Sequence, residues 1–296
     1  MLTSAGISHA ENRSGDLPTN DQKAGPERDS SQEQQGRFER IENIRRRLKQ
    51  TLAILSAETG TDPTAILGQI SPRTRYQSQT SDQRVQEILR ISVPFAPDWI
   101  LRVDTPFTYL DPDSPNEKSV AGLSDIRLRV GARVLKGDDG AVFLGTEVYF
   151  PTATNPQLGG NEYRVGPTVV GSYRLPDWQS TAYLWVEYLT GVTGQIGRGS
   201  NGGASADDSS TSELRIRTRF STLWSKTWWS FVEPRLFVDF DQNAKTGAVL
   251  LFEWGRRLDK HWRVYLRPEV GLWGQSVPGA FNYGVEFGVR YMFYVF

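Results

Sequence analysis

The chain has 296 residues, a formal net charge of zero and no cysteine. The lack of cysteine excludes disulfide bonds and thiolate metal sites, and the balanced charge gives no reason to expect nucleic acid as a partner. No stretch approaches the ~18 consecutive apolar residues that a membrane-spanning helix requires.

The first 36 residues lack the apolar pattern of a folded domain. Residues 1–10 have no basic region, yet Ser8-His9-Ala10 has the small-x-Ala pattern of a signal-peptide cleavage site. We interpret residues 1–10 as the remnant of a signal peptide whose start lies upstream; the alternative is a disordered tail. Residues 11–36 are almost all polar, Gly or Pro and are predicted to be a disordered linker.

Residues 37–58 have the spacing of an amphipathic helix. Its apolar positions, separated by three or four residues, are Phe38, Ile41, Ile44, Leu48, Leu52 and Leu55. Such a stripe needs a partner, because an isolated helix of this length is marginal in water. Three possibilities stay open: a trimeric coiled coil through 37–58, docking under or into a barrel formed by the later residues, or a detached helix. The stripe departs from a strict heptad, and Arg45 to Arg47 would repel one another in a bundle.

A second helical signal follows directly. Gly60 ends the first helix, and Asp62-Pro63 has the form of an N-cap with proline at the first helical position. The sequence therefore predicts that residues 37–69 hold an amphipathic helix and a short plug-like helix from Pro63 to Leu67.

From about residue 70 the hydrophobic period changes to two. In 213–220, for example, the apolar face alternates with charged residues at Glu213, Arg215, Arg217 and Arg219. Eleven such segments have the roughly 10–13 residues that a tilted strand needs to cross a bilayer. An even strand number requires one more, at 70–77. The prediction is an all-β fold, a 12-stranded antiparallel transmembrane β-barrel over residues 70–296.

A soluble β-sandwich also alternates, but three features disfavour it. Soluble strands have about 5–6 residues, half of what these segments show. Short and long connections alternate, as in barrels with short periplasmic turns. Finally, five tryptophans lie at or beside the short turns, as in an interfacial aromatic girdle: Trp99, Trp178, Trp224, Trp228 and Trp262. These features predict the outer membrane of a Gram-negative cell, with the N-terminal segment periplasmic.

The last segment resembles the C-terminal insertion signal of outer-membrane proteins. The signal residues are Val289, Tyr291 and Phe293, with Phe296 as the alternative terminal aromatic residue. The resemblance implies that outer-membrane lipid and the barrel-insertion machinery are partners.

A second resemblance depends on short motifs in the middle of the chain: Gly122-Leu123-Ser124-Asp125-Ile126, Phe150-Pro151-Thr152-Ala153-Thr154, Leu158-Gly159-Gly160 and Val165-Gly166-Pro167. Their order is similar to that in the outer-membrane transporters of the phenol-degradation meta-pathway. This resemblance implies transport of small, often aromatic, compounds. The layout of helix followed by barrel is also similar to functional-amyloid secretion pores, which implies a polypeptide pore gated by its N-terminal helices. An autotransporter translocator is a weaker alternative.

The alternation also predicts which side chains line the pore: Arg90, Arg102, Arg127, Arg129, Arg133, Arg215, Arg217, Arg219, Arg235, Arg263, Arg267, Glu147, Glu253 and Glu269. Arginines outnumber carboxylates on this face, and rings of arginine select anions. The alternative is a structural ladder of arginine–carboxylate pairs that fills a narrow barrel.

Nothing in the sequence indicates an enzyme. The only histidines, His9 and His261, are not placed to activate a serine on the membrane-facing wall. No catalytic residue, metal site or cofactor is predicted. We expect a pore for small molecules, aromatic or anionic, with the polypeptide secretion pore as its alternative.

Overall fold

The computed structural model describes residues 30–192 and 211–295, with side chains from residue 34 onward. The predicted signal remnant, most of the predicted linker and Phe296 lie outside these residues. The chain divides after Asn43 into two units. No helix among the described residues is long and apolar enough to span a membrane.

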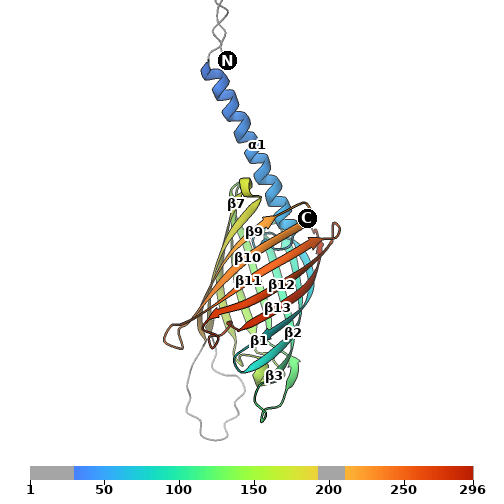
Figure 1. The fold of residues 1–296 in the computed structure, drawn as a ribbon, viewed down its shortest axis with the longest axis vertical. Coiled ribbons are helices and arrows are strands. Elements are labelled where there is room, and N and C mark those ends of the chain that lie inside the picture. Colours follow the sequence, from blue (N-terminus) through green and yellow to red (C-terminus); the bar gives the residue numbers. More distant parts are fainter. Residues whose placement is uncertain (1–29, 193–210, 296) are drawn as a thin grey trace, which may run out of the picture. The chain divides into compact units, whose positions relative to one another are not determined.

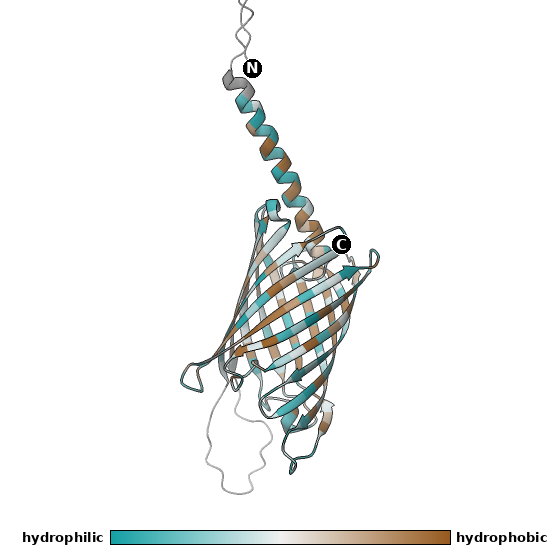
Figure 2. Cartoon of the chain, in the orientation of Figure 1, coloured by the Kyte–Doolittle hydropathy of each residue, from teal (hydrophilic) through white to brown (hydrophobic). Residues whose placement is uncertain are grey.

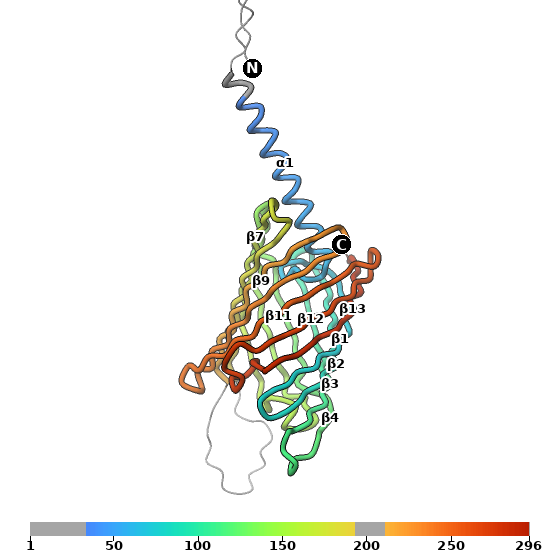
Figure 3. Tube along the Cα trace, in the orientation of Figure 1, coloured from blue at the N-terminus to red at the C-terminus, as the bar shows by residue number. Residues whose placement is uncertain are grey.

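Antiparallel strands form one closed sheet (Figure 1). The strands are β1 (Gly68–Ser78), β2 (Asp82–Ala96), β3 (Trp99–Pro112), β4 (Val120–Leu123), β5 (Ile126–Lys136), β6 (Gly140–Phe150), β7 (Arg164–Leu175), β8 (Ser180–Gly191), β9 (Ser212–Leu223), β10 (Trp228–Asp239), β11 (Lys245–Arg257), β12 (Trp262–Trp273) and β13 (Tyr283–Phe293). Apart from β4 and β5, which both pair with β3, each strand pairs with its neighbours in sequence, and β1 pairs with β13 to close the ring. The tube in Figure 3 shows the resulting up-and-down course.

The short strands β4 and β5 are two halves of one spanning strand, because both pair with β3. The break at Ser124 and Asp125 lies opposite Pro106, which accepts a bond from Ser124 N at 2.9 Å but has no N–H to donate. The described residues therefore form the predicted 12-stranded antiparallel β-barrel.

The barrel has its apolar side chains outside and its charged side chains inside. On β13, Tyr283, Val285 and Phe287 are exposed, whereas Glu286 and Arg290 are buried. Figure 2 shows apolar and polar bands alternating along the strands. This distribution is the reverse of that in a soluble protein and is typical of a sheet whose outer surface faces lipid.

Two sets of exposed aromatic side chains border the outer surface. The five tryptophans beside the short turns are 41–68% exposed. The second set lies near the opposite strand ends: Phe107, Tyr109, Tyr188, Phe240, Trp273 and Tyr283. Aromatic rings gather at the two membrane–water interfaces, so the chain is a transmembrane barrel of the outer-membrane type.

The N-terminal helix α1 (Ser30–Glu58) corrects two predictions. Residues 30–36, predicted to be disordered, are helical, because their Gln and Glu residues are good helix formers and no proline lies between Pro26 and Pro63. The plug-like helix at 63–67 is absent. There Asp62 Oδ1 accepts bonds from Thr64 N and Oγ1, at 2.8 and 2.7 Å, and holds a turn. Gly60 ends α1 as predicted, at φ +72°.

Candidate functional site in the barrel lumen

Most of the predicted pore-lining arginines lie beside a carboxylate. Among the described residues the pairs are Arg90 and Arg127 with Asp104, Arg129 with Glu147, Arg133 with Asp98, Arg215 with Glu213, Arg217 with Glu187, Arg219 and Arg235 with Glu233, Arg267 with Glu253 and Arg75 with Glu269. In the part of the chain that is described, Arg102 and Arg263 are the two predicted arginines without a carboxylate within 4.0 Å. Much of the arginine surplus therefore belongs to a paired ladder.

One part of this ladder is saturated. Glu253 accepts bonds from Trp229 Nε1 at 3.0 Å, from Arg290 Nη2 at 2.8 Å and from Arg267. Glu286 accepts bonds from Tyr265 Oη and Arg267 Nη1, both at 2.8 Å. Both carboxylates are fully buried. A buried network with every member satisfied gives rigidity, so these groups stabilise the wall.

Another part keeps an excess of positive charge. Asp104 lies within 3.5 Å of Arg73 Nη2, 2.7 Å of Arg90 Nε and 2.8 Å of Arg127 Nη2. On the adjacent pair of strands, Arg102 lies directly opposite Arg129. Like charges directly opposite one another destabilise a sheet, so an anion bound there would relieve their repulsion.

Arginines that are each paired with a carboxylate also lie against two inward-facing aromatic rings. The guanidinium carbons of Arg164, Arg127 and Arg215 lie 4.6, 5.6 and 5.9 Å from the centre of the Tyr149 ring. For the Trp185 ring, the corresponding distances are 4.1 Å from Arg129 and 5.0 Å from Arg217. We call this set the arginine–aromatic cluster: Tyr149, Trp185, Arg127, Arg129, Arg164, Arg215 and Arg217.

The cluster and the neighbouring Glu187 have buried polar atoms without partners among the described residues. Trp185 Nε1, Arg129 Nε and Glu187 Oε1 make no hydrogen bond. Buried polar groups are normally paired, so these atoms are available to a bound molecule or to water. Sequence reasoning assigned Glu147 to the lumen but missed Tyr149 and Trp185. The period-two pattern could have found both rings, since Tyr149 lies two residues after Glu147 and Trp185 lies two residues before Glu187, an acidic residue in the same alternating pattern.

Residues 49–67, which we call the plug, run from the short-turn rim, where Lys49 pairs with Asp139, into the lumen. Leu52 is 5% exposed and packs with Leu223, Trp229 and Tyr265. Further along, Ile66 packs against a buried cluster that includes Trp185. The plug thus extends from the mouth of the barrel to the arginine–aromatic cluster. Of the three possibilities left open by the sequence, the structure shows docking, with the barrel wall as the partner of Leu52.

Arginines of the wall bind the backbone of the plug. Arg263 Nε donates to Glu58 O at 2.6 Å, Arg290 Nη1 donates to Thr59 O at 3.4 Å, and Arg219 donates to Thr61 O. These carbonyls follow the C-terminal turn of α1, where partial negative charge is left without helical donors. Two of the arginines predicted to line the pore, Arg219 and Arg263, therefore hold the plug together with Arg290.

The comparisons with known proteins support the fold. No protein-family model matches the chain, and no curated protein matches its sequence. An outer membrane channel from Pseudomonas putida F1 is similar in structure, with 10% identity over 79% of this chain and 100% of that chain and a TM-score of 0.63. The NanC porin has 14% identity over 75% of this chain and 98% of its own, with a TM-score of 0.53. At these identities the likeness shows a shared barrel fold.

Proposed function

We propose that this chain is an outer-membrane channel for small anionic molecules, foremost aromatic carboxylates, whose short-turn mouth is occupied by the plug. The observation that carries the proposal is the arginine–aromatic cluster. Guanidinium groups there flank the faces of Tyr149 and Trp185 at 4.1–5.9 Å. A planar aromatic carboxylate would find ring surfaces for stacking and charged donors for its oxygens.

Two further observations support this choice. Solved proteins with the same fold include an outer membrane channel and a porin. The motifs from Gly122 to Pro167 resemble those of transporters for small aromatic compounds. The outer membrane of a Gram-negative cell, with the short turns and the N-terminal segment in the periplasm, is part of the same proposal, as is the absence of enzymatic activity.

The proposal requires the plug to move. With Leu52 and Ile66 packed on the inner wall, residues 49–67 occupy the route between the cluster and the short-turn mouth. The structure thus corresponds to a closed state. Opening must break the arginine bonds to Glu58, Thr59 and Thr61, so we expect brief openings separated by long closures.

Planar-bilayer recordings with the full chain test the proposal. Under a KCl gradient, the reversal potential should favour chloride, and benzoate should block the chloride current. Replacing Trp185 with Leu should weaken the benzoate block by up to about tenfold, since stacking of one aromatic pair contributes about 0.5–1.5 kcal/mol. Tyr188→Leu, on the lipid-facing side of the same strand, is the matched control. Equal permeability to both ions, with no benzoate block, would contradict the proposal.

The polypeptide secretion pore is the second candidate. It is favoured by the direct continuation of α1 into the plug, because traction on an N-terminal helix could withdraw residues 49–67. An extended polypeptide added at the short-turn side separates the two candidates. If it enters, the current is blocked in long events whose duration depends on voltage. A channel for small molecules shows no such events.

A further inference from the structure

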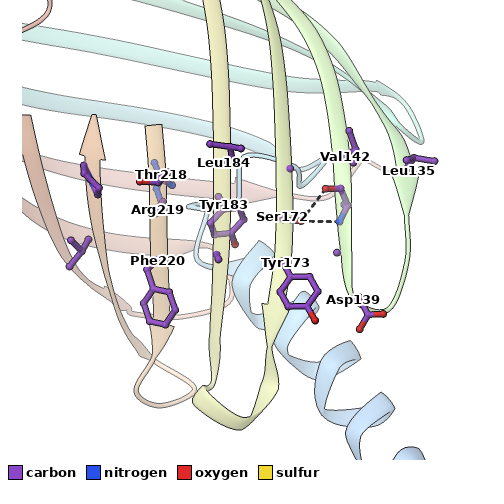
Figure 4. A pocket seen from close by; sticks show the side chains of 16 residues that line it. Leu135, Asp139, Val142, Ser172, Tyr173, Tyr183, Leu184, Thr218, Arg219 and Phe220 are labelled. Atoms are coloured by element: carbon purple, nitrogen blue, oxygen red, sulfur yellow. Dashed lines mark hydrogen bonds between the residues drawn. The ribbon is translucent and has the colours of Figure 1, made fainter. Parts of the chain in front are cut away.

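The lipid-facing wall contains a hollow of about 690 Å³ over β6 to β10 (Figure 4). We call it the wall groove, and the side chains that bound it include Val142, Tyr173, Leu184, Phe220 and Val232. Gly171 forms part of its floor, where a Cβ atom would meet no atom within 4 Å. Its volume lies in the range of about 300–1,000 Å³ found for small-molecule sites.

The groove continues into a charged pocket at the short-turn rim. This second pocket, of about 350 Å³, is lined by Arg45, Lys49, Arg174, Asp177 and Trp178, among others. We call it the basic rim pocket. Tyr173 lines both hollows, so they adjoin. An apolar hollow in the bilayer region thus opens into a pocket with three basic side chains and one acidic side chain.

The positions of these hollows match the two parts of a lipid. Leu184 and Phe220 are 50% and 39% exposed on the outer wall, which faces lipid in a barrel of this kind. Trp178 is 68% exposed in the aromatic girdle, at the level of the headgroups. We propose that the wall groove and the basic rim pocket together bind one anionic phospholipid, with an acyl chain in the groove and the phosphate beside Arg45 and Lys49.

Charge favours an anionic lipid over a zwitterionic one. Lys49 is paired with Asp139, and Arg46 Nε lies 3.7 Å from Asp138. Arg174 is 9% exposed and donates to the Asp138 carbonyl at 2.9 Å. Arg45 has no carboxylate within 4.0 Å among the described residues, so its charge is available to a phosphate. Each basic side chain near a membrane surface adds about 1 kcal/mol of attraction for anionic lipid.

The site would couple the membrane to the plug. Arg45 and Lys49 lie one turn apart on α1, and Lys49 begins the plug, whereas Tyr173 and Leu184 belong to the wall. A lipid held by both parts binds only when the plug is docked. By linkage, such a ligand stabilises the docked state.

Native mass spectrometry of the full chain tests the proposal. The folded protein is presented with equal amounts of phosphatidylglycerol and phosphatidylcholine that have identical acyl chains. We expect one retained phosphatidylglycerol per chain and little phosphatidylcholine. Arg45→Gln should reduce the retained phosphatidylglycerol about fivefold, as expected for the loss of one charge near the headgroup. Arg47→Gln, on the same helix but outside the pocket, should leave it unchanged.

The groove is tested separately. Gly171→Trp fills the floor of the wall groove and should abolish retention of phosphatidylglycerol. Val169→Trp, on the same face of β7 but outside the groove, should leave this retention unchanged. Unchanged heat-modifiable migration in gels shows that both variants keep the barrel. Equal retention by the two tryptophan variants, or equal retention of the two lipids by the parent chain, would overturn the proposal.

Discussion

Arg263 of the barrel wall caps the C-terminal end of α1: its Nε donates to the carbonyl oxygen of Glu58 at 2.6 Å. Its Nη1 donates to Lys260 O at 2.8 Å, and the side chain is fully buried. A positive charge at a helix C-terminus is stabilising because the last carbonyls carry partial negative charge and lack helical donors. Through this contact, a single residue of β12 holds the helix that closes the short-turn mouth.

Replacing Arg263 with Gln should therefore loosen the plug. A hydrogen bond from a charged donor contributes about 1.5–3 kcal/mol, so the open fraction should rise by roughly tenfold to a hundredfold. Single-channel recordings measure this fraction directly. Arg256→Gln, on the lipid-facing side of β11, is the control. If the two variants have the same open fraction, Arg263 does not hold the mouth closed.

Arg102 should contribute to ion selectivity without supporting the fold. Its Nε donates to Ser92 Oγ at 3.1 Å, and it has no carboxylate within 4.0 Å in the described residues. Arg102→Gln removes positive potential from the lumen without leaving an acid unpaired. We expect the reversal potential in a KCl gradient to shift toward that of potassium, with unchanged resistance to urea. An unchanged reversal potential would mean that ions do not pass this part of the wall.

Arg267, in contrast to Arg102, should support the fold. It bridges the buried carboxylates of Glu253 and Glu286, each of which would lose a charged partner in Arg267→Leu. Breaking a buried ion pair on one side costs about 3–5 kcal/mol, so the free energy of unfolding should fall by that order. Urea unfolding of the barrel in lipid vesicles, followed by tryptophan fluorescence, measures the change. Arg256→Leu should change it by less than about 1 kcal/mol, as for an exposed arginine.

The plug should dock more firmly at low pH. Burial raises the pKa of the Asp62 carboxyl above its usual value, against the opposing effect of the bonds from Thr64. The docked state therefore takes up a proton more readily than the undocked state. Docking is strongest below the usual pKa of about 3.9 and weakens as the pH rises through the raised value.

Conductance should consequently increase with pH across that interval. In Asp62→Asn, which cannot ionise, the increase should be lost. Recordings between pH 4 and pH 8 compare the two proteins. If the variant keeps the pH dependence of the parent, another group is responsible.

The orientation can be tested with single cysteines, since the chain has none of its own. Lys226 lies in the short turn between β9 and β10, and Asn243 lies in the connection between β10 and β11. In intact cells, a membrane-impermeant maleimide should label Asn243→Cys but not Lys226→Cys. Labelling of both after lysis is the control. The reverse pattern in intact cells would place the short turns outside.

The sequence by itself determined the barrel. The period-two pattern, visible in Tyr283 to Phe293, is a local property, because successive side chains of a strand point to opposite faces. The tryptophans beside the short turns could also be located from the sequence alone. Together these features predicted the strand number and the membrane-facing side, both of which are present in the structure.

Only the tertiary structure decided what the inner charges do. Charge counting gave an excess of arginine, but it could not show that Arg290 reaches Glu253, 37 residues away, or that Arg263 binds the helix end. Partners across a closed sheet depend on register and barrel diameter, which no local pattern contains. The plug illustrates the same limit. The helical spacing placed Leu52 on the apolar face of the helix. Its contact with Trp229 exists only because closure of the barrel creates an inner wall.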